Sequence, residues 1–244
     1  MSLTVKKIFV IVRKNMKIYY LKAPIIIFGI IFPFFLFLAF SIGRDVSVAY
    51  LFPGIISITM FFSSSSIGPA IPPWETNMKT LERILSTPIS ITSVVFGDII
   101  SGFLYGFALT IVPFLLSIFY TALQSYAVVL LAIILGSFCF SSLGTLISTY
   151  PTDTPSTSMM ISSLVRFPII FISGVFISVN DLPAAGKYIS FISPLTYIVD
   201  IIRFSFGQKN FMAIWIDFLV VFLFTILFII SSLLLHKKFL PRRL

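Results

Sequence analysis

Six long apolar runs constrain this chain more than any other feature of its sequence. They cover residues 23–42, 48–67, 94–119, 126–147, 156–177 and 211–235. A helix needs about 20 apolar residues to cross the roughly 30 Å hydrocarbon core of a bilayer, and each run reaches that length. The connections between the runs leave no room for a soluble domain. We therefore predict an all-α integral membrane protein, with six transmembrane helices in one transmembrane domain over residues 1–244.

The basic residues predict how the spans are oriented. Ten of them precede the first run or follow the last one: Lys6, Lys7, Arg13, Lys14, Lys17, Lys22, Lys237, Lys238, Arg242 and Arg243. Lys79 and Arg83 follow the second run, whereas connections on the opposite side hold Arg44, Lys187, Arg203 and Lys209. Because cytoplasmic segments are enriched in Lys and Arg, we expect both termini inside the cell and the protein in the cell membrane. Nucleic-acid binding is not expected, because these charges do not form one folded surface.

The segment before the first run, residues 1–22, has its own pattern. Five basic residues fall on one side of a helical wheel, and most of the apolar residues lie outside that arc. This pattern predicts a helix that lies in the inner membrane interface, with its cations near anionic head groups. The alternative is a disordered basic anchor that only sets the topology.

A charged amphipathic segment, residues 74–90, separates the second and third runs. Its apolar and charged residues fall on opposite faces at 100° per residue: Met78, Leu81, Ile84 and Leu85 on one, Glu75, Lys79, Glu82 and Arg83 on the other. Pro72 and Pro73 precede the segment and Pro88 lies near its end, which favours a single short helix between them. A two-faced helix on the cytoplasmic side is expected to dock on a partner.

The connection between the fifth and sixth runs, residues 178–210, holds too many apolar residues for a solvated loop. Asn180 or Asp181 can cap a helix near Leu182–Pro183, and Ser193 can cap a second helix with Pro194 at its first position. Two short apolar helices between spans predict a re-entrant pair that enters the outer leaflet. The alternative is a hairpin packed on the ends of the spans.

Arg166 lies inside the fifth run, where burying a charge costs roughly 2.5–3.5 kcal/mol on insertion scales. Two interpretations remain open. Arg166 could line a substrate-facing cavity for an anionic head group, or it could be a structural residue that is paired or reaches the interface.

Sequence motifs for catalysis are missing. The chain has no G-x-x-x-x-G-K-[ST] phosphate loop and no G-x-S-x-G motif, and its single Cys139 and single His236 predict no metal site. We therefore expect no enzyme activity and no bound cofactor. An ion-gradient-driven transporter would need acidic residues at the midplane and paired broken helices. A polytopic membrane enzyme would need a polar catalytic cluster. Both remain alternatives to a transport subunit that draws energy from a partner.

Two segments together resemble the type-2 ATP-binding-cassette permeases, the transmembrane subunits of exporters of drugs, polysaccharides or lipid-linked glycans. The first consists of Glu75, Thr80, Leu81, Glu82, Arg83, Ile84, Leu85, Thr87, Pro88, Ile89 and Ser90. The second is Ser173–Phe176, Leu182–Pro183 and the run SPLTYIVDIIR over Ser193–Arg203. The resemblance covers nearly the whole chain.

The resemblance implies an exporter permease that pairs with a second permease, identical or related, and with separate ATPase subunits that bind ATP and Mg²⁺. Residues 74–90 would be the coupling helix, and its contacts with the ATPase would come from Glu75, Lys79, Leu81, Glu82, Arg83, Leu85, Thr87 and Pro88. The re-entrant pair would form the outer gate through Leu182, Pro183, Pro194, Leu195, Tyr197 and Arg203. Residues 1–22 would be the connecting helix. The exported substrate is not specified by the resemblance.

Overall fold

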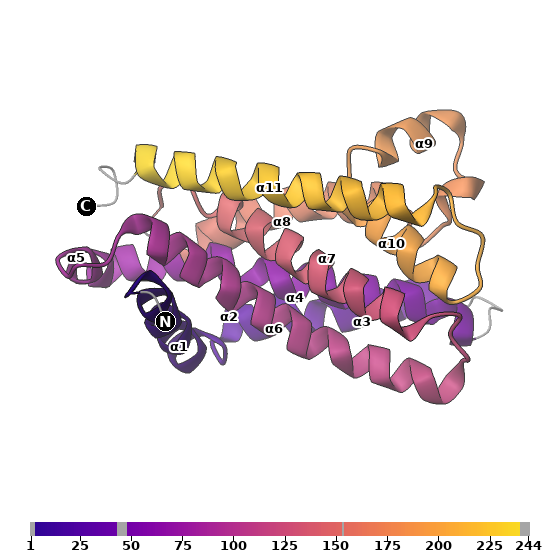
Figure 1. Cartoon of the computed structure of the whole chain (residues 1–244), viewed down its shortest axis with the longest axis horizontal. Helices are drawn as coiled ribbons and strands as arrows, with labels where there is room; N and C mark the ends of the chain where they lie inside the picture. The colour runs from indigo at the N-terminus through magenta and orange to yellow at the C-terminus, as the bar shows by residue number, and fades with distance from the viewer. Residues whose placement is uncertain (1–2, 43–47, 153, 240–244) are drawn as a thin grey trace.

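The computed structural model describes residues 3–42, 48–152 and 154–239, and these residues form an elongated bundle of helices with no strand (Figure 1). Arg44, Arg242 and Arg243, which entered the topology prediction, lie outside these ranges. The elements in chain order are α1 (Leu3–Tyr19), α2 (Ala23–Ile26), the π-helical η1 (Ile27–Ile31), α3 (Phe32–Ser41), α4 (Val48–Asn77), α5 (Thr80–Leu85), α6 (Ile91–Tyr120), α7 (Tyr126–Ile147), α8 (Pro155–Ile172), the 3₁₀ turn η2 (Val179–Asp181), α9 (Ala184–Ser190), α10 (Pro194–Ser205) and α11 (Ile214–Phe239).

Five helices are long and apolar enough to cross a membrane, namely α4, α6, α7, α8 and α11. A sixth candidate is a broken span formed by α1 together with the unit α2–η1–α3, whose two parts meet at 90°. We refer to the unit α2–η1–α3 as the first span. The all-helical class and five to six candidate spans therefore agree with the apolar pattern. Figure 1 places α1, α5 and the C-terminal part of α11 at one end of the bundle, and α9 and α10 at the other. We refer to these as the α5 end and the α10 end.

A π-helical turn interrupts the first candidate span at Ile27–Ile31. Its cause lies in the sequence, because Pro33 has no N–H and cannot donate to the carbonyl of Gly29 four residues earlier. The Ser63 hydroxyl of α4 donates to that carbonyl over 2.9 Å. A neighbouring helix thus satisfies the backbone oxygen that the proline leaves free, as an apolar environment requires.

Helix α4 runs through the middle of the bundle and packs against α6, α7 and α8. Four consecutive serines, Ser63–Ser66, are fully buried there. A Cβ added to Gly68 or Gly144 would overlap backbone atoms of the facing helix, so α4 and α7 approach closely at small residues.

The structure corrects the single helix expected over residues 74–90. Helix α4 continues through Pro72 and Pro73 to Asn77, and α5 is a separate helix of 6 residues. Packing maintains α4 across the prolines, since Ile67, Ala70 and Ile71 are fully buried immediately before them. Lys79 then separates the two helices, because its φ of 51° is left-handed and cannot continue either one.

The connection between α8 and α11 contains the two expected short helices. Ser193 precedes α10 and Pro194 occupies its first turn, as predicted, but the Ser193 hydroxyl forms no capping hydrogen bond. The other capping prediction was wrong, because Asn180 and Asp181 lie in the turn η2 and α9 begins after Pro183. The amide of Asp181 donates to the carbonyl of Ser178 within η2, so Asp181 belongs to that turn and not to the start of α9. Nearly every residue of α10 is buried, so this helix belongs to the core.

Candidate functional site

Helix α1 is attached to both sides of the segment that contains α5. The ammonium of Lys14 forms an ion pair with Glu75 at the end of α4, and the ammonium of Lys7 donates to the carbonyl of Pro88 beyond α5. Glu75 is only 1% exposed, whereas the Lys14 side chain is 22% exposed. These two contacts bracket α5 on the chain, so α1 limits how far the segment can move by itself.

A buried amide adds a third attachment between α1 and the start of α6. Asn15 is fully buried, and its Nδ2 donates to Asp98 over 2.7 Å and to the Ser101 hydroxyl over 3.1 Å. The Tyr20 hydroxyl, just after α1, donates to the carbonyl of Ser101 over 2.6 Å. Helix α1 is therefore part of the folded α5 end, which agrees with the helix expected there and not with a disordered anchor.

Aromatic contacts complete this attachment. Tyr19 stacks on Trp74 with ring centroids 5.8 Å apart, and the Lys22 ammonium lies 5.6 Å from the Trp74 ring. Burial raises the pKa of the Tyr19 phenol, and the nearby carboxylates of Glu75 and Asp98 raise it further. Tyr19 therefore remains neutral at physiological pH and acts here as a packing residue.

The residues expected on the docking surface divide into two groups. Leu81 is 4% exposed and Glu75 is buried against Lys14, so both face the bundle. Leu85 is partly buried, and five side chains are exposed: Lys79, Glu82, Arg83, Thr87 and Pro88. The charged face expected to include both Glu75 and Lys79 is therefore divided, because α4 ends before Lys79 and Glu75 pairs with Lys14 of α1.

Two buried groups behind α5 were given no role from the sequence. Asp98 and His236 line a cavity of about 10 Å³ together with Glu75 and Leu81, a space of about one water. His236 is 6% exposed, and its ring lies 3.4 Å from the Ser148 hydroxyl and 2.9 Å from the Ser232 carbonyl. It is thus a buried residue that links α11 and α7 at the α5 end. Ser232, one helical turn before His236 on α11, is the feature of the sequence that could have indicated a buried polar partner for this histidine.

Arg166 lies in the middle of α8 and is fully buried. Its Nε donates to the Ser162 carbonyl over 3.3 Å, and its Nη1 donates to the Ser66 hydroxyl of α4 over 3.1 Å. The guanidinium carbon lies 5.5 Å and 5.8 Å from the ring centroids of Phe62 and Phe28. Within the described ranges no Asp or Glu forms an ion pair with it. Arg166 therefore does not reach the interface, and the partners that the described residues give it are a serine hydroxyl, a backbone carbonyl and two aromatic rings.

The residues expected at the outer gate lie at the α10 end, on α10 itself and in the short connection between η2 and α9. Pro194, Leu195, Tyr197 and Arg203 are buried along α10, while Leu182 and Pro183 lie before α9 and are more exposed. Arg203 donates to the Val175 carbonyl over 3.2 Å, and the Tyr197 hydroxyl donates to the Phe191 carbonyl over 2.8 Å.

Asp200 was missing from the expected gate residues. Its carboxylate accepts hydrogen bonds from the amides of Phe211 and Met212 over 2.7 to 2.9 Å, which joins α10 to the start of α11. An aspartate among the apolar residues of SPLTYIVDIIR is the sequence feature that could have indicated a structural role for Asp200.

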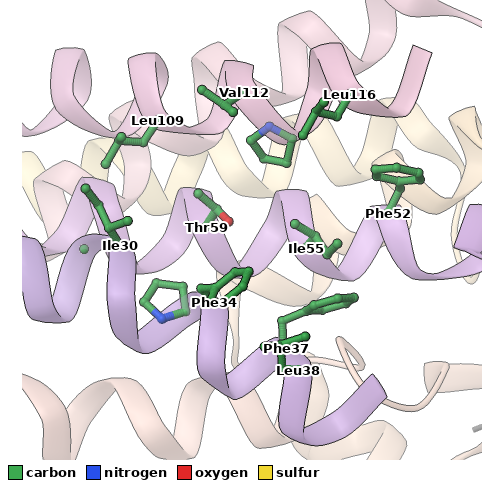
Figure 2. Close-up of a pocket in the computed structure, with 13 residues that line it drawn as sticks. Ile30, Phe34, Phe37, Leu38, Phe52, Ile55, Thr59, Leu109, Val112 and Leu116 are labelled. Atoms are coloured by element: carbon green, nitrogen blue, oxygen red, sulfur yellow. The ribbon is translucent and has the colours of Figure 1, made fainter. Parts of the chain in front are cut away.

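A groove of about 340 Å³ opens on the surface between the first span, α4 and α6 (Figure 2). Its lining is apolar except for Thr59, and the side chains of Phe34, Phe37 and Ile55 lie around it. Phe34 is 57% exposed, so the groove lies on a surface that bilayer lipid would cover in a spanning protein.

Comparison with known proteins adds sequence relationships to this geometry. Residues 6–207 match the family described as ABC-2 type transporter. The probable multidrug ABC transporter permease YbhS of Escherichia coli K12 is 24% identical over 190 residues, which cover 77% of this chain and 48% of YbhS. Nodulation protein J of Rhizobium meliloti is 31% identical over 131 residues, covering 51% of this chain and 48% of that protein. The inner membrane transport permease YadH of Escherichia coli K12 is 25% identical over 134 residues, covering 54% and 52%. The chain thus spans about half the length of the curated relatives it matches.

Proposed function

Because the chain belongs to the ABC-2 type transporter family, we propose that it is the transmembrane subunit of an ATP-binding-cassette exporter. The observation that carries this proposal is the attachment of α1 to both sides of α5, which holds a short charged helix at one end of the bundle. A bundle of membrane helices without a phosphate loop needs an external source of energy, and a fixed, exposed helix provides a place to receive it.

In this proposal α5 and its flanking turns dock on an ATPase subunit that binds ATP and Mg²⁺. The contacts come from the exposed residues Lys79, Glu82, Arg83, Thr87 and Pro88, with Leu85 at the edge. Glu75 and Leu81 act indirectly, by fixing the segment to α1 and to the bundle. The α5 end therefore faces the cytoplasm, and both termini of this cell-membrane protein lie in the cytoplasm, as the basic residues predict.

The α10 end then faces outward, and α10 with the turn before α9 forms the outer gate. A second permease copy or a related permease completes the translocation path. Helix α8 is less enclosed by its own chain than α4, α6 and α7, and Leu164 on it is 67% exposed, which supports a position beside the path or the second permease.

The test is co-purification of Mg²⁺-dependent ATPase activity with the tagged full chain from native membranes. The double variant Glu82→Arg, Arg83→Glu reverses two exposed charges on α5 and should abolish the co-purified activity while leaving membrane insertion unchanged. Lys209→Glu, an exposed charge reversal at the α10 end, should retain it. Normal ATPase recovery with the α5 double variant would refute the assignment of the docking helix.

A further inference from the structure

The guanidinium of Arg166 has unused hydrogen-bonding capacity inside the bundle. Its Nη2 has no hydrogen-bond partner, although the residue is fully buried. Ser162 lies one helical turn earlier on α8, is also fully buried, and its hydroxyl has no partner either. Two unsatisfied polar groups of one helix face are thus enclosed together, whereas buried polar groups are normally hydrogen-bonded.

The immediate surroundings do not neutralise the positive charge. The partners that Arg166 has are a backbone carbonyl, a serine hydroxyl and the faces of Phe28 and Phe62. A buried cation is retained at a cost that a paired anion would offset. A guanidinium matches oxyanions in particular, because its N–H groups can donate to two oxygens of a phosphate or carboxylate.

The fold also provides a way to uncover this group. Helix α8 packs mainly against α4, and its other side exposes Met160 and Leu164 at 60% and 67%. Across the α4–α8 contact, Arg166 is held by one hydrogen bond, the 3.1 Å contact with the Ser66 hydroxyl. Movement of α8 away from α4 therefore breaks little polar structure and frees Nη1 beside Nη2, which has no hydrogen-bond partner to lose.

We infer that Arg166 and Ser162 bind the oxyanionic head group, a phosphate in its simplest form, of an amphipathic molecule that enters between α4 and α8. This inference rests on the proposed export function and names the chemistry of its substrate. The phenyl rings beside the guanidinium fit an amphipathic ligand better than a hydrated ion, because they replace water around the charged group.

The test is photolabelling of the full chain in phosphatidylcholine nanodiscs. The probe is a phosphatidic acid with a photoreactive diazirine in one acyl chain, and the matched neutral probe is the corresponding diacylglycerol. The wild-type chain should be labelled more strongly by the phosphatidic acid. Arg166→Met should lower that labelling roughly tenfold, the effect expected for a lost charge-assisted contact, without changing the labelling by diacylglycerol. Arg166→Lys should retain part of it, and Lys209→Met at the α10 end should retain all of it.

Further arms separate the possible outcomes. Competition by inorganic phosphate alone would show a free-anion site and overturn the amphipathic part of the inference. Equal labelling of the wild type and Arg166→Met would overturn it completely. If Arg166→Met fails to fold, Ser162→Ala keeps the charge and should lower phosphatidic acid labelling severalfold, and unchanged labelling would refute the site. Because labelling needs no ATPase, its failure alongside normal ATPase co-purification would refute this inference alone.

Discussion

The ion pair between Lys14 and Glu75 leads to an asymmetric prediction. Glu75 is 1% exposed and Lys14 is 22% exposed, so the two ends of the pair differ in their access to water. Lys14→Met leaves a buried carboxylate without its cation. Glu75→Gln leaves an ammonium that water can still reach. The lysine substitution should therefore destabilise the protein more than the glutamate substitution.

The magnitude follows from this difference in exposure. Removing one partner of a fully buried pair costs about 3–5 kcal/mol, while exposed pairs are worth about 0–1 kcal/mol. For this half-buried pair we expect about 2–3 kcal/mol from Lys14→Met and about 1 kcal/mol from Glu75→Gln. At roughly 2–4 °C per kcal/mol for a chain of this size, Lys14→Met should lower the melting temperature by about 4–12 °C.

The assay is thermal unfolding of the purified full chain in detergent, followed by tryptophan fluorescence. Trp74 stacks on Tyr19 beside the ion pair and reports the α5 end directly. The control is Lys17→Met, which removes an exposed cation from the same helix and should change stability by less than about 0.5 kcal/mol. The double variant Lys14→Met, Glu75→Gln should be more stable than the sum of the single variants implies, by about 1–2 kcal/mol. Equal effects of Lys14→Met and Lys17→Met, or strict additivity, would refute the reasoning.

Two further predictions concern packing inside the bundle. Gly144→Ala should prevent accumulation of a monodisperse protein, because the added Cβ would lie 2.6 Å from the Ser65 carbonyl oxygen. In the control variant Gly54→Ala the nearest atom to the added Cβ lies at 3.5 Å, so this substitution should be tolerated. Size-exclusion profiles of both variants test this difference. Ser63→Ala should lower the melting temperature by about 2–8 °C, because it removes the donor to the carbonyl in the π turn and costs about 1–2 kcal/mol. A Ser63→Ala melting temperature equal to that of the wild type would contradict this account of the turn.

The transmembrane pattern could be predicted from the sequence because helix length and apolar burial are local properties. The expected span over residues 126–147 has the same bounds as α7. The end of α4 could not be predicted in this way. Prolines favour helix ends, but buried packing maintains α4 through Pro72 and Pro73, and the sequence does not show that packing.

The candidate site could be predicted only in part, for a similar reason. Periodicity identified Glu82 and Arg83, two exposed charges of the proposed docking surface. It could not show that Glu75 faces Lys14, because these residues are 61 positions apart and meet only after α1 folds back. The contact of Asn15 with Asp98 joins residues 83 positions apart and has no local signal. Long-range polar pairs require the arrangement of the helices, which composition and periodicity leave open.

The π turn in the first span also determines which side chains reach the groove of Figure 2. A π turn holds about one residue more than an α turn, so everything after it is rotated by about 100° relative to an uninterrupted helix. Pro33, Phe34 and Phe37 follow the turn and line the groove. The groove therefore depends on helical register as well as on side-chain size. A single-residue deletion within Ile27–Ile31 would turn a different set of side chains toward α4 and α6, while leaving the composition of the span almost unchanged.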